Sequence, residues 1–332
     1  MTITPMARPG ALLTVRDLVI AVRGHEHLPL VKGIDLDVRR GETLALVGES
    51  GSGKTLTCHA IAGLIDTDLH HTGSVTIAGR SVSSMPEDEW NDVRGKDIGF
   101  IFQNPASALN PVMSVGEQVA EVLRRHHGLD RAAAWAEARR LFELARIPGA
   151  GERLRQYPHE LSGGLCQRVA IAMAIACKPL LLLADEPTTA LDVTIQAEIV
   201  RLLKDIQNEY GLAIVLVTHD LGVAAALAHD VAVMYAGTIV ESGRAADLFD
   251  RPGHPYTRGL LACDLAEAEP GRMLPTIPGT VPPLASLVSG CPFRSRCGAA
   301  IAQCATTRPT LRSVAGDHRA ACIRAASEVK AA

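Results

Sequence analysis

The 332-residue sequence lacks three features that would each indicate a particular class of protein. It has no surplus of basic charge: 33 Lys and Arg against 36 Asp and Glu give a formal net charge of −3, whereas nucleic-acid-binding domains carry basic patches. Its best candidate for a membrane span, VAIAMAIACKPLLLLA, is interrupted by Lys178 and Pro179 and is too short. Its first residues, MTITPMARPG, lack the basic start and apolar stretch of a secretory signal. We therefore expect a cytosolic chain that does not bind nucleic acid.

The remaining composition is that of an ordinary globular protein. Hydrophobic residues make up 47% and charged residues 21%, so the chain can bury a large core. Its length allows one large domain with an appendage, or two ordinary domains. In a cytosolic protein the eight cysteines are expected to be mostly reduced, so a cluster of them indicates a metal site rather than disulfides.

The clearest motif is a phosphate-binding loop. Residues 43–65, TLALVGESGSGKTLTCHAIAGLI, read as a short apolar strand, G-x-x-x-x-G-K-T and a helix, which is the context a P-loop requires. Its glycines allow backbone N–H groups to converge on phosphate oxygens. Lys54 would contact the β and γ phosphates, and Thr55 would bind Mg²⁺. A flexible glycine loop is the alternative, and the combined pattern disfavours it. The residues expected to bind nucleotide are Gly48, Glu49, Ser50, Gly51, Ser52, Gly53, Lys54, Thr55 and Leu56.

A second apolar run, LLLLA, ends on two adjacent acids, Asp185 and Glu186. Such a run is consistent with a strand buried on both faces of a parallel sheet, and ligands bind at the carboxyl ends of these strands. We expect Asp185 to hold Mg²⁺, directly or through water, and Glu186 to polarise the water that attacks the γ-phosphate. The alternative is a solvated strand-end acid, which the neighbouring P-loop disfavours.

A third motif, Ser162-Gly163-Gly164, stands before a long run of small and apolar residues. The start of a helix is an anion site, because its free N–H groups and its dipole both favour negative charge. The alternative is an ordinary N-cap followed by a Gly-Gly turn. Since one nucleotide needs only one P-loop, a second phosphate-binding element requires an explanation.

These motifs together resemble those of the ATP-binding subunits of ABC transporters. LSGG is similar to their signature motif, LLLLADE to their Walker B motif and TTALD, which ends at Asp192, to their D-loop. In that family two cassettes pair head to tail, and the signature of one closes on the ATP held by the other. The resemblance implies that Ser162, Gly163, Gly164 and Asp192 act on a nucleotide bound by a second cassette.

Two strand-end residues complete the resemblance. Gln103 in GFIFQNP corresponds to the family's Q-loop glutamine, which contacts Mg²⁺ and water. His219 in AIVLVTHD corresponds to the switch histidine, which contacts the γ-phosphate. Taken alone, each would be an ordinary strand-end residue. The resemblance implies that Gln103 and His219 act in catalysis with Glu186, and that Gln103 joins Thr55 and Asp185 at the Mg²⁺.

Longer strings narrow the resemblance to importer ATPases for dipeptides, oligopeptides and nickel, with the dipeptide type nearest. The strings are SALNP, YPHELSGG, ADEPTTALDVT, VMYAGTIVESG, HPYTRGLL, LPTIPGTVPPL and GCPFRSRC, and the matches run from about residue 11 to about residue 325. The resemblance implies an ATP-hydrolysing subunit on the cytoplasmic face of the inner membrane. Its implied partners are a related, non-identical cassette, two transmembrane permeases and an extracytoplasmic substrate-binding protein. A nickel importer and a soluble ABC ATPase acting on ribosomes or DNA are the alternatives.

The sequence differs from the family at the position that stacks on the adenine base of ATP. ABC cassettes usually stack an aromatic residue on this base, yet residues 1–47 contain no Phe, Tyr or Trp. Val22 takes that position, with His25 and His27 nearby. Because an aromatic stack contributes about 1 kcal/mol, we expect weaker or broader nucleotide selection.

The expected fold is α/β: a P-loop NTPase of the RecA-like ABC type. Residues 1–250 would form the nucleotide-binding domain, with a helical subdomain inserted at about 104–160. Trp135, Ala138, Leu141, Phe142 and Ala145 follow helical spacing there and predict a core stripe. From about residue 251 the prolines become frequent, which indicates a small irregular C-terminal extension over 251–332.

The extension carries four cysteines, Cys291, Cys297, Cys304 and Cys322, in the pattern C-x5-C-x6-C-x17-C. Four thiolates suit a [4Fe–4S] cluster or tetrahedral zinc, although the spacing is that of neither a zinc ribbon nor a ferredoxin. Four unrelated buried thiols are the alternative. The resemblance to importer ATPases implies an iron–sulfur site, with zinc as the second choice. If that site makes the chain mainly a redox sensor, Cys291→Ser should remove regulation and spare hydrolysis.

Overall fold

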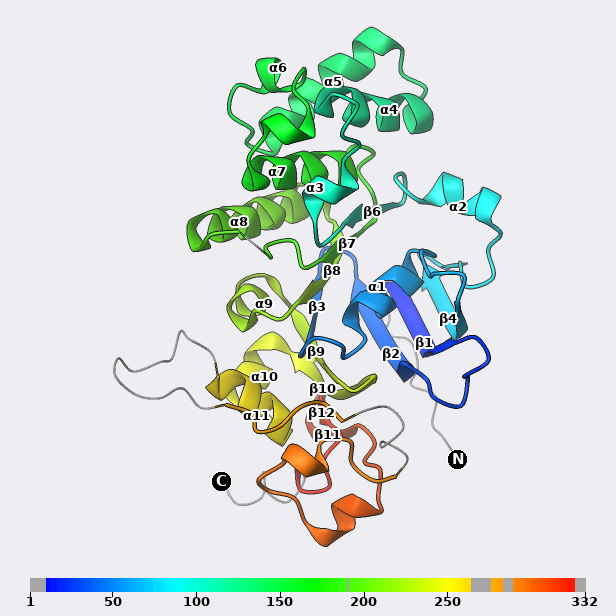
Figure 1. Cartoon of the computed structure of the whole chain (residues 1–332), viewed down its shortest axis with the longest axis vertical. Helices are drawn as coiled ribbons and strands as arrows, with labels where there is room; N and C mark the ends of the chain where they lie inside the picture. The colour runs from blue at the N-terminus through cyan, green and yellow to red at the C-terminus, as the bar shows by residue number, and fades with distance from the viewer. Residues whose placement is uncertain (1–9, 190, 264–275, 283–288, 326–332) are drawn as a thin grey trace.

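A computed structural model describes residues 10–189, 191–263, 276–282 and 289–325. The first nine residues, Ala190 of the D-loop motif and parts of the 251–332 extension therefore lie outside the described residues. Within them, two sheets and their helices form an elongated molecule (Figure 1). The helical block lies at one end and the extension at the other.

The larger sheet has eight strands in the described part of the chain, in the order β11-β12-β10-β9-β3-β8-β7-β6. The run from β9 to β6 is parallel. As predicted, β7 is wholly buried, because a parallel sheet is covered by helices on both faces. The strands are β3 (Thr43–Val47), β6 (Ile98–Ile101), β7 (Leu181–Asp185), β8 (Ala213–Thr218), β9 (Asp230–Tyr235), β10 (Thr238–Arg244), β11 (Arg312–Ala315) and β12 (His318–Ala320).

The smaller, antiparallel sheet has the order β2-β1-β4-β5. Apolar residues alternate along β1 and β2 and face a core that they share with α1 and with one face of the larger sheet. This core places α1, which follows the P-loop, between the two sheets. The elements are β1 (Ala11–Val22), β2 (Val31–Arg39), β4 (Leu69–Ile77), β5 (Arg80–Ser81), α1 (Lys54–Ile61) and α2 (Glu87–Val93).

The block predicted at 104–160 is helical. Ala138, Leu141, Phe142 and Ala145 are buried, and Trp135 packs against the same core at its edge. Beyond the predicted end of the block, α7 also packs against α3, α4 and α5. The helices are α3 (Pro105–Ala108), α4 (Val115–His127), α5 (Arg131–Leu144), α6 (Ala150–Arg153), a 3₁₀ turn (Pro158–Glu160) and α7 (Gly163–Ala174).

The remaining helices cover the sheet or belong to the extension. They are α8 (Val193–Tyr210), α9 (Leu221–Leu227), α10 (Ala245–Asp250), α11 (Pro255–Ala262) and 3₁₀ turns at Arg294–Arg296 and Ala302–Ala305. None of the described helices is both long and apolar enough to cross a membrane.

The extension is small and largely irregular, as predicted, but its hairpin β11–β12 continues the larger sheet by pairing with β10. Buried Glu241 on β10 fixes the extension here. Its carboxylate accepts the N–H groups of Gly253 and His254 at 2.5 and 2.9 Å, and it lies 2.6 Å from Nε2 of buried His318. A buried carboxylate requires such partners, so they hold the extension on the cassette.

Candidate nucleotide-binding site

The candidate residues follow four neighbouring strands, β3, β8, β7 and β6. These strands are parallel and in register, with Val47 opposite Thr218 and Asp185 opposite Val217. The carboxyl ends of the strands therefore lie at one edge of the sheet, where ligands bind in α/β proteins. The structure brings the P-loop, Gln103, Asp185, Glu186 and His219 to this edge.

The P-loop adopts a conformation that only glycine allows. Gly48 has φ +148°, and a Cβ there would lie 2.2 Å from the carbonyl oxygen of Met234. Gly53, at φ +103°, begins α1. The loop curls over the side chain of Lys54, whose Nζ donates to the carbonyls of Gly48 and Glu49 at 2.7 and 2.9 Å. Burial lowers the pKa of Lys54, and three nearby carboxylates offset part of this effect.

One buried polar atom of the loop indicates that the loop binds phosphate. Ser52 Oγ is enclosed and finds no hydrogen-bond partner among the described residues. Buried hydroxyls are normally paired, so such an atom indicates a missing ligand or ion. The curled backbone, the orphan hydroxyl and the Lys54 ammonium together fit a nucleotide phosphate chain.

The residues proposed for Mg²⁺ also fit the ion. Thr55 Oγ1 donates to Asp185 Oδ1 at 3.1 Å, and Asp185 is 2% exposed. Burial raises the pKa of Asp185, although Thr55 and the nearby His59 oppose the shift. Hydroxyl and carboxylate oxygens are the donors that Mg²⁺ prefers, and a divalent charge would offset the cost of the buried carboxylate.

Glu186 lies at the centre of the candidate catalytic group. Its Oε2 accepts from Thr189 Oγ1 at 2.8 Å and from Gln103 Nε2 at 3.0 Å, and its Oε1 lies 3.3 Å from His219 Nδ1. Burial alone would raise the pKa of Glu186. Hydrogen bonds from Thr189 and His219, with the charge of Lys54, outweigh burial and lower it. The carboxylate is therefore ionised at neutral pH and able to accept a proton.

The backbone of Glu186 is also unusual. Its φ is +48°, in the left-handed region that non-glycine residues rarely adopt, and its N–H donates to Val217 O at 2.9 Å. Such conformations persist only where the surroundings enforce them, and they are frequent at functional sites.

The third motif begins α7. Ser162 Oγ accepts from the N–H of Leu165 at 3.4 Å, and both Ser162 and Gly163 are exposed. A Cβ on Gly163 would meet nothing within 4 Å, whereas one on Gly164 would lie 3.1 Å from Ile195. Packing against Ile195 therefore favours a small residue at Gly164, whereas no contact in the described chain explains a glycine at 163.

Two other predicted positions lie at element ends. Asp192 caps α8 by accepting from the N–H of Ile195 at 2.9 Å. Val22 ends β1 and is 37% exposed. His25 and His27 follow it in an exposed turn, with ring centroids 6.1 Å apart. The structure thus places an exposed apolar side chain at the position where the resemblance implies an aromatic residue, with two exposed histidines shortly after it in the chain.

The four cysteines of the extension line one small cavity of about 20 Å³. Burial, together with the other three thiols, raises the pKa of Cys291. In the described part of the chain, no three His, Cys, Asp or Glu side chains are arranged to hold a metal ion. The convergence of Cys291, Cys297, Cys304 and Cys322 fits the predicted pattern, and the metal stays a prediction.

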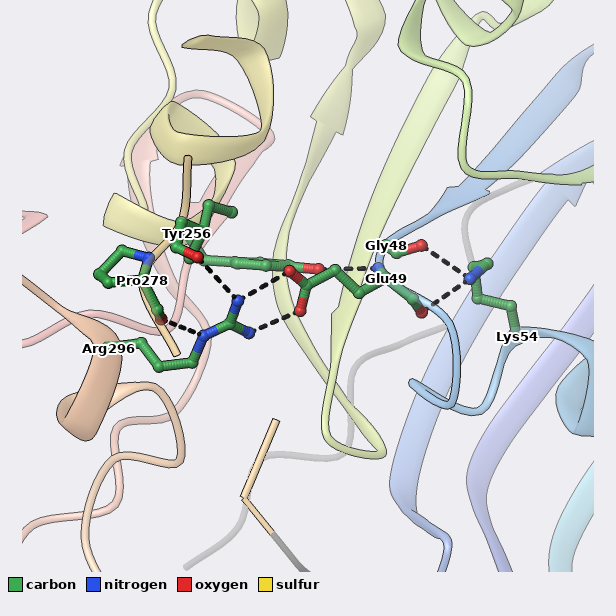
Figure 2. Close-up of polar contacts among 7 residues, drawn as sticks. Gly48, Glu49, Lys54, Tyr256, Pro278 and Arg296 are labelled. Atoms are coloured by element: carbon green, nitrogen blue, oxygen red, sulfur yellow. Dashed lines mark hydrogen bonds and ion pairs between the residues drawn. The ribbon is translucent and has the colours of Figure 1, made fainter. Parts of the chain in front are cut away.

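The sequence motifs do not predict four residues that lie near the site: His59, Thr189, Tyr256 and Arg296. His59 lies 4.0 Å from Asp185, and Thr189 donates to Glu186. Tyr256 and Arg296 contact Glu49 from the extension (Figure 2). The signal that could have indicated them is Glu49 itself, because an acid in a phosphate-binding loop needs a cation beside it.

Comparisons with known proteins decide the family. The family described as "ABC transporter" matches residues 31–189, and "Oligopeptide/dipeptide transporter, C-terminal region" matches residues 240–304. The oligopeptide transport ATP-binding protein OppD of Salmonella typhimurium is 45% identical over 331 residues, which cover 99% of this chain and 98% of that protein. The chain belongs to the ATP-binding proteins of ABC transporters, of the oligopeptide/dipeptide type.

Other similarities agree. OppD of Bacillus subtilis is 47% identical over 295 residues (88% of this chain, 82% of that protein), and a putative peptide import ATP-binding protein of Brucella melitensis is 48% identical over 307 residues (89% and 91%). The ATP-binding cassette MJ0796, solved as a dimer with ADP and Pi, matches with TM-score 0.63 and 30% identity over 70% of this chain and 98% of that one. The predicted ABC fold is confirmed, and the chain is an ATP-hydrolysing transport subunit.

The electrostatics of this ABC ATPase predict opposite effects of Asp185→Asn on activity and stability. Hydrolysis should fall by about 100-fold or more, while the free energy of unfolding of the nucleotide-free chain should rise. Because burial raises the pKa of Asp185, its ionised form opposes folding at neutral pH, and asparagine removes that charge while keeping an oxygen for Thr55. The gain in the free energy of unfolding should be complete above the pKa of Asp185 in the folded chain. It should vanish as the pH falls below the pKa of an aspartate in the unfolded chain, about 3.9.

Urea denaturation at several pH values, with Asp92→Asn as an exposed control, measures this difference. A loss of stability in Asp185→Asn at neutral pH would contradict the assignment of a buried, unfavourably ionised carboxylate.

Proposed function

We propose that this ATPase powers the uptake of dipeptides or longer oligopeptides as one cassette of an importer. The observation that carries the proposal is the extension: its region matches the oligopeptide/dipeptide transporter family, and it folds onto the P-loop of the ABC cassette. The relatives described above are named for oligopeptide or peptide transport, which favours peptides over the nickel alternative.

The proposal includes the position of the chain in a complex. It would lie as a peripheral subunit at the cytoplasmic face of the inner membrane, with two transmembrane permeases and an extracytoplasmic substrate-binding protein. Residues 1–250 would form the nucleotide-binding domain, with the helical subdomain at about 104–160 docking on the permeases, and 251–332 the extension. The helical block lies at the end of the molecule opposite the extension (Figure 1), so both could act at once.

The site residues have distinct proposed roles. Lys54 and the P-loop amides would hold the β and γ phosphates of ATP. Thr55, Asp185 and Gln103 would hold Mg²⁺, which neutralises phosphate charge when it is bound. Glu186, held by Thr189 and Gln103, would orient the attacking water and accept its proton.

His219 has the exposure expected of a phosphate contact. Its side chain is 58% exposed beside Glu186, so it can turn toward the γ-phosphate without disturbing the core. A second, homologous but non-identical cassette would supply the other half of each site, because Ser162 and Gly163 are exposed at the start of α7 and packing in the described chain gives no reason for a glycine at 163. Asp192 would lie at the same interface.

The head-to-tail dimer predicts the behaviour of Gly163→Ala. We expect the variant to fold with unchanged or slightly higher stability, because a Cβ at 163 meets nothing and alanine favours helix by about 1 kcal/mol. The test uses the Glu186→Gln variant, which should bind ATP with little turnover, together with the second cassette. When Gly163→Ala is added to this variant, its ATP-dependent association with the second cassette should weaken. Analytical ultracentrifugation with and without Mg-ATP measures this.

The matched control is Gly128→Ala. Gly128 ends α4 far from the nucleotide site, and a Cβ there also meets nothing within 4 Å, although its φ of +63° adds backbone strain. If the Gly163→Ala variant dimerises as strongly as the Glu186→Gln variant without it, there is no reason to assign Ser162, Gly163 and Gly164 to a partner's nucleotide.

We also propose a [4Fe–4S] cluster at the four cysteines, with zinc as the alternative. Four thiolates suit either group, and all four described cysteines line one cavity. The resemblance to importer ATPases supports the choice of the cluster over zinc. Anaerobic purification should yield iron and acid-labile sulfide with a broad visible absorption. Stoichiometric zinc, or no metal, would overturn the iron–sulfur assignment.

The transported solute is tested with the native complex, because the solute would not contact this chain. We expect the chain to co-purify from membranes with permeases and a binding protein, and ligands extracted from that binding protein to be peptides. Recovery of nickel would support the alternative importer, and recovery with ribosomes or DNA instead of membranes would contradict transport.

A further inference from the structure

The C-terminal extension holds the P-loop residue Glu49 from two directions (Figure 2). Arg296 donates from Nη1 and Nη2 to the two oxygens of the Glu49 carboxylate, at 2.6 and 2.9 Å. The backbone N–H of Glu49 donates to the hydroxyl of Tyr256 at 2.8 Å. Both the side chain and the backbone of a nucleotide-binding residue are therefore fixed by a segment far along the chain.

Arg296 is held rigidly in this contact. Its side chain is 5% exposed, its Nε donates to Pro278 O at 2.8 Å, and its guanidinium lies 5.8 Å from the ring centroid of Tyr235. A planar guanidinium that binds both carboxylate oxygens constrains the carboxylate in direction as well as distance. The pair thus orients Glu49 and neutralises its charge.

Tyr256 fixes a single peptide plane. The N–H of Glu49 and the C=O of Gly48 belong to the same peptide and point in opposite directions, because that peptide is trans. Tyr256 accepts from its N–H, and Lys54 donates to its C=O at 2.7 Å. The Tyr256 ring is buried against Tyr235 and Phe293, with centroids 4.7 and 5.3 Å away, so the hydroxyl stays where the peptide needs it.

We propose that Arg296 and Tyr256 are positioning residues of the nucleotide site, through which the extension sets the P-loop for ATP. Tyr256 holds the peptide whose oxygen places Lys54. Arg296 neutralises a carboxylate that would otherwise repel the triphosphate at short range. The inference depends on ATP binding at the P-loop and is independent of the transported solute.

The test measures the Kd of the full chain for Mg-ATP alongside nucleotide-free thermal unfolding. We expect Arg296→Gln to weaken binding about tenfold, the scale of a lost charge-assisted hydrogen bond. Tyr256→Phe, which keeps the ring, should weaken binding about threefold with little change in unfolding temperature. Arg294→Gln is the matched control, because it removes the same charge from the same 3₁₀ turn, where Arg294 donates to Ser289 O rather than to Glu49.

A double variant separates positioning from general destabilisation. If Arg296 acts through Glu49, Glu49→Gln with Arg296→Gln should bind ATP no more weakly than the weaker single variant, because the two losses share one interaction. Arg296→Lys, which keeps the charge but loses the fork, should lie between wild type and Arg296→Gln. Additive losses, or wild-type affinity in both Arg296→Gln and Tyr256→Phe, would overturn the inference. Failure of the wild-type chain itself to bind Mg-ATP would instead overturn the proposed function.

Discussion

The common direction of the strands in the parallel sheet is the constraint on which the site depends. Strands β3, β8, β7 and β6 are neighbours in one register, so whatever follows each strand emerges at the same edge. A residue needs only to follow its strand closely to reach the candidate site. This is why Lys54, Gln103, Glu186 and His219, from distant parts of the sequence, form one group without long loops to bring them together.

Bringing several carboxylates to one edge of the sheet costs electrostatic free energy. The surroundings of each carboxylate offset this cost in a different way. Asp185 is buried with a raised pKa, a state that favours a divalent cation beside Thr55. Glu186 is held ionised by hydrogen bonds and by the charge of Lys54, as a proton acceptor requires. Glu49 is neutralised by Arg296. The charges are thus balanced separately, while the Lys54 ammonium is held inside the P-loop by the carbonyls of Gly48 and Glu49.

The gathering of the candidate site at one sheet edge could largely be predicted from the sequence, because its parts are short local motifs. The P-loop, the acids after β7 and the residues after β6 and β8 each follow a recognisable apolar strand. The contacts of Glu49 with Arg296 and of Glu241 with His318 could not be predicted, since they join positions 247 and 77 residues apart. No local pattern predicts such a pairing. The β11–β12 hairpin was not predicted either. Frequent prolines indicate irregular backbone, but composition does not indicate which short segments pair at the edge of a sheet.

The extension is part of the nucleotide site in a mechanical sense. Residues 291–297 line the thiol cavity at both ends, and between them Phe293 packs on Tyr256 while Arg296 binds Glu49. Whatever holds Cys291 and Cys297 in place therefore supports both contacts to the P-loop, and the buried Glu241 separately anchors the β11–β12 hairpin of the extension through His318. A region characteristic of peptide-type transporters can act on ATP in this way without touching the solute. On this proposal, the specialisation of the cassette lies in how the extension supports its P-loop through Glu49.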